Sequence, residues 1–200
     1  VIRRYVALKE SYYTCDAKPT QQKVSKAITD RAILLLSRFQ FDNFVFDSIS
    51  IDDHFLSFFI ELTTARQIKS IRILNCDFDE NLRPDGKTRF VSMFVKAAPI
   101  SIQIDLLCEG SLFDEKFLRE CSRLTEFTIT TNDRSLFRPS EDFIDVLLRF
   151  KTFKMPRMFV NGSWLFALLL RRLRMQREGE YYFRIDRKIN PMGISEALDP

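Results

Sequence analysis

One arrangement of apolar residues recurs along this chain at a nearly constant interval. Its clearest copy is Ile68–Phe78 (IKSIRILNCDF), where apolar residues or Cys occupy the first, fourth, sixth, ninth and eleventh positions. The fourth position of this frame recurs at Phe44, Ile71, Ile102, Phe127 and Phe153. These residues are separated by 27, 31, 25 and 26 positions, and such a period indicates a chain built from stacked structural units.

The frame matches the leucine-rich-repeat pattern L-x-x-L-x-L-x-x-N/C-x-L, with copies that begin at Phe41, Ile68, Pro99, Leu124 and Phe150. Alternating apolar residues in each copy predict a strand with one side toward a core. Apolar residues at helical spacing lie between the copies, so each unit should be a strand, a turn and a helix. We therefore predict an α/β fold, an irregular leucine-rich-repeat-like solenoid with a curved parallel sheet on the inner face and helices on the outer face.

Residues that cap helices precede each of the helical patterns. Ser, Thr and Asp accept a hydrogen bond from a backbone N–H group of the first helical turn, which otherwise has no partner. Apolar residues at helical spacing follow each one. The predicted caps are Asp52 or Asp53, Thr88, Asp114, Ser140 and Ser163.

The two ends of the chain depart from the repeat. Ile2–Leu8 alternates like a strand, and Thr20–Arg38 begins with a capping Thr and has the apolar spacing of a helix. Tyr181–Ile189 alternates like a last strand, and its Phe183 lies 30 positions after Phe153. This segment is expected to be a degenerate sixth unit that closes the stack.

Three segments follow from these patterns. Residues 1–38 should form an N-terminal strand and helix cap, residues 39–190 about five strand–helix units and the terminal strand, and residues 191–200 a tail. Because the chain begins at Val1 without an initiator Met, we expect it to be part of a longer protein.

The composition is that of a folded domain. Apolar residues make up 46% of the chain and charged residues 29%, and the net charge of +4 does not demand a nucleic-acid or membrane partner. The longest apolar run, Trp164–Leu170, is too short to cross a bilayer, so no membrane partner is expected. Twenty Phe residues against five Gly predict a core rich in aromatic rings.

The four cysteines show no C-x-x-C spacing and have no neighbouring His. Free buried thiols are therefore predicted in place of disulfides or zinc ligands, as in an intracellular protein of the cytoplasm or nucleus. These residues are Cys15, Cys76, Cys108 and Cys121.

No group of residues has the pattern of an active site. His54, the single histidine, stands at a predicted helix start without a nucleophile motif, so it is interpreted as a polar residue of that helix. The acidic turn Asp77–Glu80 lacks the Gly and the further oxygen ligands of a calcium loop. The glycines are isolated and form no phosphate-binding loop. We expect a protein that is not an enzyme and holds no metal or cofactor.

The residues that the frame leaves unspecified are the candidates for partner binding. Because side chains alternate along a strand, they should point out of the inner sheet face, away from the core. Two of them, Val45 and Leu74, are apolar and are proposed as anchors for a protein partner. The predicted partner-binding residues are Val45, Asp47, Arg72, Leu74, Asn75, Gln103, Asp105, Thr128, Thr130, Lys154 and Arg157.

An alternative interpretation comes from the basic segment 157–188. It holds eight Arg or Lys residues against three acids, interleaved with Tyr181, Tyr182 and Phe183. Basic and aromatic residues in this mixture are typical of RNA-binding surfaces. The same arginines also suit the C-terminal end of a helix, where they complement the helix dipole, so both interpretations stay open.

The irregular units resemble the C-terminal F-box-associated (FTH-type) repeat domains of nematode F-box proteins. The resemblance rests on IKSIRILNCDF, LTEFTITTND and FKMPRMFVNGSWLFALLLRRLR, and it covers about residues 40–190. It implies substrate recognition within an F-box-type ubiquitin ligase, with Skp1 and cullin as partners through an F-box. Residues 1–40 do not have the pattern of that three-helix module, so the F-box would lie outside this chain.

Overall fold

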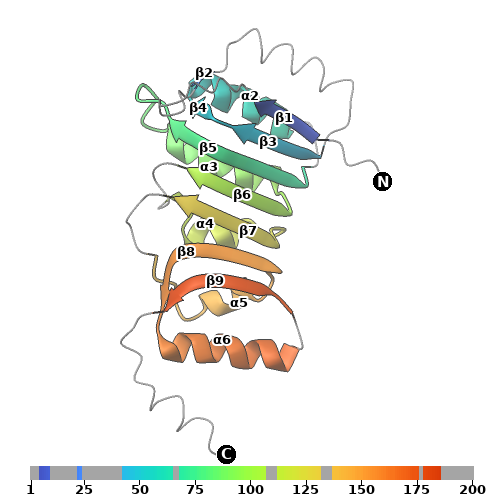
Figure 1. Ribbon diagram of the computed structural model, residues 1–200, viewed down its shortest axis with the longest axis vertical. Helices are drawn as coiled ribbons and strands as arrows, with labels where there is room; N and C mark the ends of the chain where they lie inside the picture. Colours follow the sequence, from blue (N-terminus) through green and yellow to red (C-terminus); the bar gives the residue numbers. More distant parts are fainter. Residues whose placement is uncertain are drawn as a thin grey trace, which may run out of the picture.

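The described strands run parallel to their neighbours in a single sheet. The computed structural model describes residues 5–9, 22–23, 42–64, 68–106, 112–131, 137–175 and 178–185. The main strand order is β1 (Tyr5–Lys9), β3 (Asn43–Asp47), β5 (Ser70–Phe78), β6 (Ser101–Leu106), β7 (Glu126–Thr131), β8 (Thr152–Val160) and β9 (Glu180–Ile185) (Figure 1). Two short strands complete the sheet at one end: β2 (Gln22–Lys23) pairs with β4 (Ile49–Ile51), and β4 pairs with β5.

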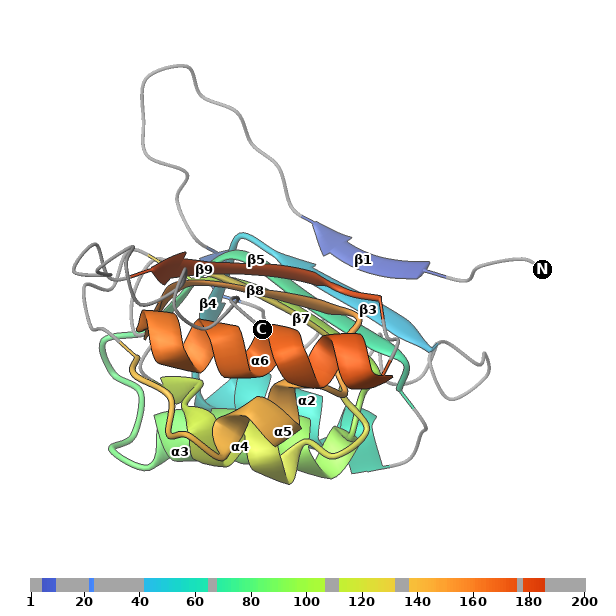
Figure 2. The same cartoon turned by 90° about the horizontal axis from the view of Figure 1, so that it is seen from below.

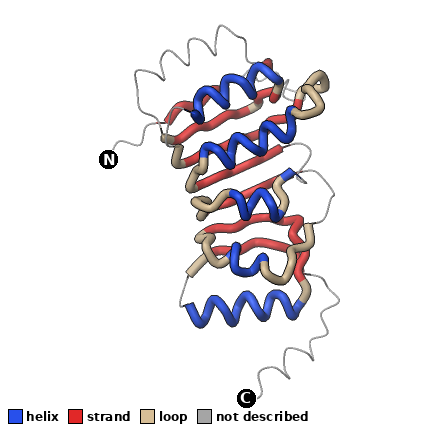
Figure 3. The backbone as a smooth tube through the Cα atoms, turned by 180° about the vertical axis from the view of Figure 1, so that it is seen from behind, coloured by secondary structure: helices blue, strands red, loops and turns tan. Residues whose placement is uncertain are grey.

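Helices connect the successive strands from β4 onward and cover one face of the sheet. They are α2 (Asp53–Thr64), α3 (Gly86–Ala97), α4 (Glu115–Glu120), α5 (Phe143–Leu147) and α6 (Gly162–Met175). Each helix contacts the next one along the chain, so the helices form a row that follows the order of the strands (Figure 3). In Figure 2 the described helices all lie on the same side of the sheet. The predicted α/β class and parallel sheet are confirmed.

The register of the sheet confirms the spacing found in the sequence. Parallel pairing places the fourth-position residues side by side, each opposite the next, in the order Phe44, Ile71, Ile102, Phe127 and Phe153. All of them are buried. These residues are separated by unequal intervals in the sequence and still form one row in the sheet, because the turns and helices between the strands differ in length.

Phenylalanine rings join the units into one core. Phe46 of β3 packs edge-to-face on Phe59 of α2, with ring centroids 5.4 Å apart, and Phe59 packs on Phe94 of α3 at 5.7 Å. Further ring contacts continue through Phe117 and Phe127 to Phe153 and Phe150. Edge-to-face pairs add to the stabilisation that burial provides. The predicted aromatic core is confirmed.

Two helix caps are as predicted and three are not. Asp52 and Asp114 accept hydrogen bonds from Phe55 N (2.7 Å) and Phe117 N (2.9 Å). The other three predictions are wrong, because the helices begin at different residues. Thr88 lies inside α3, which begins at Gly86, and Asp142 precedes α5 where Ser140 was predicted. Asn161, not Ser163, caps α6 by accepting from Trp164 N at 2.8 Å.

Two further predictions are corrected by strand pairing. Gln22–Lys23 is a strand on β4 where the sequence predicts the start of a helix, because hydrogen bonds to β4 outweigh the local helical pattern. A register shift in β5 places Leu106 beside Cys76, so Leu106 occupies the core position predicted for Leu107.

The terminal strand is confirmed with different bounds. It pairs with β8 so that Tyr181, not Phe183, lies opposite Phe153. The remainder of the predicted helix Thr20–Arg38, together with Cys15, Leu107, Cys108, Asn132 and the tail 191–200, lies outside the described residues.

Candidate functional site

No described helix covers the other face of the sheet (Figure 2). Its side chains alternate with the buried ones along each strand, and none of them is buried. We call this surface the open face. It consists of Asn43, Val45, Asp47, Ser70, Arg72, Leu74, Ser101, Gln103, Asp105, Glu126, Thr128, Thr130, Thr152, Lys154, Glu180 and Tyr182.

A continuous row of six side chains crosses the middle of the open face. Parallel pairing aligns six residues, one from each of β3, β5, β6, β7, β8 and β9: Val45, Arg72, Gln103, Thr128, Lys154 and Tyr182. Neighbouring strands lie about 4.8 Å apart, so the row is roughly 24 Å long, enough to contact a peptide or an exposed loop of another protein. The structure thus brings together five of the residues that the sequence predicts, and it adds Tyr182.

The carboxyl ends of the strands form an acidic corner of the open face. Asp47 lies opposite Leu74, and Asn75 donates a hydrogen bond from Nδ2 to Asp47 Oδ1 at 3.1 Å. Asn75 has a φ of 52°, a left-handed conformation that Asn tolerates better than most residues. Burial raises the pKa of Asp105, and the negative charge of Asp47 raises it further.

The two proposed apolar anchors lie where the sequence predicts, but they are not fully exposed. Val45 and Leu74 are both half-buried among their neighbours on the open face. Tyr182 is different, because 59% of its surface is exposed to solvent. Aromatic residues carry a large share of the energy in protein interfaces. The alternation of Tyr181–Ile189 predicted a strand here, and the same alternation would have identified Tyr182 as an outward residue.

Arg157 departs from the predicted row. The pairing of β8 with β9 shifts between Lys154 and Phe159, and Arg157 lies within this irregular stretch. Its side chain is half-buried and donates from Nη2 to the Thr131 carbonyl oxygen at 3.0 Å. Arg157 therefore joins β8 to β7. Lys154, in contrast, stays on the open face and forms an ion pair with Glu180 at 2.6 Å.

The described arginines of α6 have structural partners as well. Arg172 is buried, and its guanidinium carbon lies 4.5 Å from the ring centroid of Tyr181. It donates from Nη2 to the Phe150 carbonyl oxygen at 2.8 Å. A Cβ atom at Gly179 would lie 2.3 Å from Arg172 Nη2, so the glycine leaves the space that the guanidinium fills. Arg171 pairs with Asp145 of α5. These contacts favour the structural interpretation of the basic segment over the RNA-binding one.

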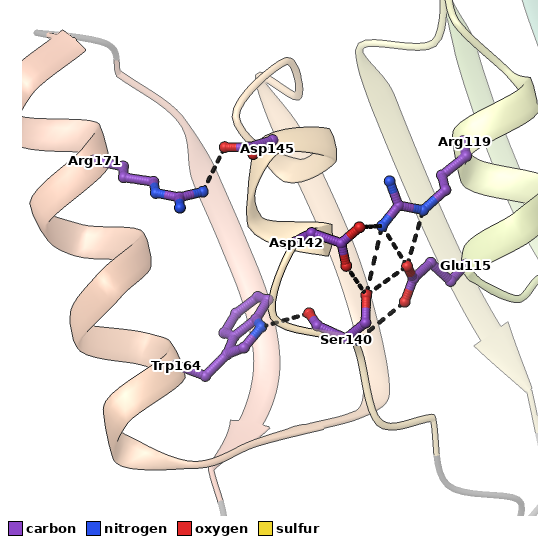
Figure 4. A network of polar contacts seen from close by, with 7 residues as sticks. All are labelled: Glu115, Arg119, Ser140, Asp142, Asp145, Trp164 and Arg171. Carbon is purple, nitrogen blue, oxygen red and sulfur yellow. Dashed lines mark hydrogen bonds and ion pairs between the residues drawn. The ribbon is translucent and has the colours of Figure 1, made fainter.

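A polar network joins α4, the start of α5 and α6 (Figure 4). At its centre, Ser140 donates from Oγ to Glu115 Oε1 at 2.7 Å, while its carbonyl oxygen accepts from Trp164 Nε1 at 3.0 Å. Arg119 bridges Glu115 and Asp142. Burial by itself would raise the pKa of Glu115. Hydrogen bonds from Ser140 and Arg119 have the larger combined effect, so the pKa lies below its ordinary value. The network connects neighbouring strand–helix units through α4, α5 and α6. Its carboxylates, Glu115 and Asp142, both pair with Arg119.

The two candidates for chemistry follow neighbouring strands: His54 lies three residues after β4, and the acidic turn lies at the end of β5, which pairs with β4. His54 lies half-buried in the first turn of α2, and Asp79 of the acidic turn accepts from Asn81 N at 2.9 Å. Among the described residues, no three His, Cys, Asp or Glu side chains are grouped as metal ligands. Cys76 and Cys121 are buried free thiols, as predicted. The described helices are each too short or too polar to cross a bilayer.

Comparison with known proteins adds nothing to this geometry. No protein family, curated protein or solved structure matches the chain. The open face, with its central row and acidic corner, holds most of the residues that the sequence predicts for partner binding.

Proposed function

We propose that this chain is a protein-interaction module, an irregular leucine-rich-repeat-like solenoid that binds a partner protein on its open face. The observation that carries the proposal is the row of six aligned side chains. Regular apolar residues lie on the other face, while this row changes character from strand to strand. Variable residues on a regular, rigid sheet are the arrangement by which repeat proteins select partners.

The charges of the open face indicate the chemistry of the partner. Asp47 ends β3, where its carboxylate accepts from Ser48 and Asn75, and Asp105 is the residue before the end of β6. Burial raises the pKa of Asp105. A Lys or Arg of the partner would contact this acidic corner, while an apolar side chain would cover Leu74 and a further one Tyr182. We therefore expect an extended segment with a basic residue between apolar ones, in keeping with interface energy concentrated in few contacts.

From the resemblance to nematode F-box proteins we propose further that this module belongs to a ubiquitin ligase. In that role the chain is the substrate-recognition part of an F-box-type adaptor, and Skp1 and cullin bind a separate F-box. The chain itself then performs no catalysis, because the other subunits supply the transfer chemistry. RNA binding through residues 157–188 is the alternative, and it is weakened by the contacts of Arg157, Arg171 and Arg172 within the fold.

A double variant of the open face tests the proposal. Arg72→Glu with Leu74→Ala changes one exposed and one half-buried side chain of β5, so the melting temperature should stay within about 2 °C of the wild type. Proteins captured from nematode extract and identified by mass spectrometry should lose at least one specific partner with this variant. Lys116→Glu, a charge reversal at an exposed position of α4, is the matched control and should keep that partner.

Site-specific photo-crosslinking gives a second readout. A photoreactive amino acid at Gln103 on the open face should crosslink to the same partner, and one at Lys116 on the helix side should not. Capture that survives Arg72→Glu with Leu74→Ala, or crosslinks only from position 116, would remove the open face as the binding surface. Skp1 and cullin peptides with a longer form that includes an F-box, and not with this chain, would support the adaptor role.

A further inference from the structure

The large apolar side chains exposed on the described surface gather at one end of the molecule. They are Leu169, Leu170, Leu173 and Met175 of α6 and Tyr182 of β9. Leu173 is 75% exposed and Leu169 52%. The helix at the other end of the described row, α2, is different, because Ser57 and Glu61 are the exposed ones among those of its side chains that the structure describes. One end helix thus has a polar outer side and the other an apolar one.

Four apolar residues of α6, three exposed and one half-buried, form a stripe along the helix. Phe166, Leu169, Leu170 and Leu173 follow the spacing i, i+3, i+4 and i+7, which places them on one side of an α-helix. Trp164, Leu168 and Arg172 are the buried residues of α6, and they lie on the opposite side. We call Phe166, Leu169, Leu170 and Leu173 together the outer stripe. Its spacing is that of a helix surface that packs against another helix.

The row of helices shows what is missing at this end. Consecutive helices contact each other from α2 through α6, so α3, α4 and α5 each have a helix on both sides. In the described part of the chain α6 has a helix on one side only, and it lies at the end of the stack (Figures 1 and 3). Repeat proteins end their stacks with a polar outer face when nothing covers them. The apolar outer stripe therefore resembles the surface of a helix inside a stack, which packs against the next helix.

The charges of α6 indicate which kind of helix could pack on the outer stripe. From Gly162 to Met175 the helix contains no acid and three arginines. Arg172 is buried and Arg171 pairs with Asp145, whereas Arg174 is exposed beside the outer stripe. Two copies of α6 packed on each other would bring arginines together without a carboxylate from either helix. A helix with acids along the border of its apolar side would complement the charge instead.

We propose that the outer stripe of α6 is a second binding surface, which takes an amphipathic helix of a partner protein with acidic residues bordering its apolar side. This surface lies at the end of the stack and is distinct from the open face. The occupant would pack on Leu169, Leu170 and Leu173, and a carboxylate would pair with Arg174. It would add to the row of helices in the position that follows α6.

Binding of two synthetic helical peptides to the full chain tests this proposal. Both peptides, of about 20 residues, carry Leu at i, i+3, i+4 and i+7 positions; one has Glu along the border and the other Lys. Fluorescence anisotropy should show the Glu peptide binding at least about tenfold more tightly than the Lys peptide. Arg174→Glu should reverse this preference, and Leu169→Asp with Leu173→Asp should abolish binding of both. Ser57→Asp on α2 should change nothing.

Two measurements on the protein alone exclude other occupants. The chain should stay monomeric in sedimentation velocity, and Leu173→Cys should react quickly with a maleimide, as read by mass spectrometry at position 173. A dimer that Leu169→Asp with Leu173→Asp dissociates would assign the stripe to a second copy and overturn the proposal. A protected Cys at position 173 in the monomer would assign it to another part of this chain. Unchanged Glu-peptide affinity in the Asp variant, with an unchanged thermal melt, would also overturn it.

Discussion

On the helix side of β7, Phe127 and Ile129 are buried, whereas Thr128 and Thr130, which alternate with them, lie on the open face. The same contrast holds in β3, where Phe44 alternates with Val45. The covered face repeats one type of residue from strand to strand, because every unit must fill the same space under a helix. The open face has no such requirement, so its residues differ at each strand. The regular face accounts for stability, and the variable face is where binding specificity can reside.

The largest test of this contrast compares adjacent residues of β7. Phe127→Ala removes a ring whose centroid lies 5.8 Å from that of Phe153 and 6.1 Å from that of Phe117, and it should lower the free energy of unfolding by about 3–5 kcal/mol. Thr128→Ala on the open face should change it by less than about 0.5 kcal/mol. Urea unfolding followed by circular dichroism measures both values. A comparable loss from Thr128→Ala would mean that the open face is itself packed.

The next test concerns two arginines of α6 that lie two positions apart. Arg172→Met removes the 2.8 Å donor to the Phe150 carbonyl oxygen, which keeps the Tyr181 hydroxyl as a donor at 3.2 Å, and it removes the cation stacked on the Tyr181 ring. It should cost about 1–3 kcal/mol. Arg174→Met changes an exposed side chain and should cost less than about 0.5 kcal/mol. Thermal and urea unfolding of the two variants provide the comparison. Equal losses would show that Arg172 is not a structural residue.

A third test distinguishes the two faces by their response to pH. Burial raises the pKa of the Cys76 and Cys121 thiols to about 12, from 9.0 in an exposed thiol. The folded chain therefore keeps two protons that the unfolded chain loses, and stability should fall as the pH rises from 9 toward 12. Each thiol contributes a slope of about 1.4 kcal/mol per pH unit within that window.

Variants isolate this contribution from the other groups that titrate in alkali. Cys76→Ala with Cys121→Ala should give a shallower decline between pH 9 and 11 than the wild type, even though the double variant is less stable at neutral pH. The free energy of unfolding measured in urea at each pH provides the slope. The open-face variant Asp105→Asn should keep the wild-type alkaline slope, because its carboxyl titrates in acid. Identical slopes for the wild type and the Cys variant would show that the thiols are not desolvated.

The sequence predicted the covered face better than it predicted the ends of elements. The core positions of the frame that fall on described residues, from Phe44 to Val160, can be followed in the structure, and the register aligns the fourth position of every copy as the spacing requires. The helix starts were less predictable, since Thr88, Ser140 and Ser163 are all good caps in isolation. The residue that caps is decided by where the preceding strand leaves the sheet, which depends on pairing with a distant segment.

The open face was predictable in part for the same reason. Alternation along a strand places Arg72, Gln103 and Thr128 on it without any knowledge of the fold. Arg157 could not be placed in this way, because a register shift in β8 interrupts the alternation. Alternation along the last strand could also have placed Tyr182 on the open face, but only its pairing with Lys154 shows that it completes the row.

By itself the sequence determined the period, the strand–helix units and the side of each strand that faces the core, since these follow from local alternation and spacing. Only the tertiary structure decided how the units end. It shows that Arg172 is buried against Tyr181 and that the apolar residues at i, i+3, i+4 and i+7 of α6 face away from the core. An apolar stripe in a sequence does not say which side of a helix will be covered, because coverage depends on the neighbours that the chain brings to it.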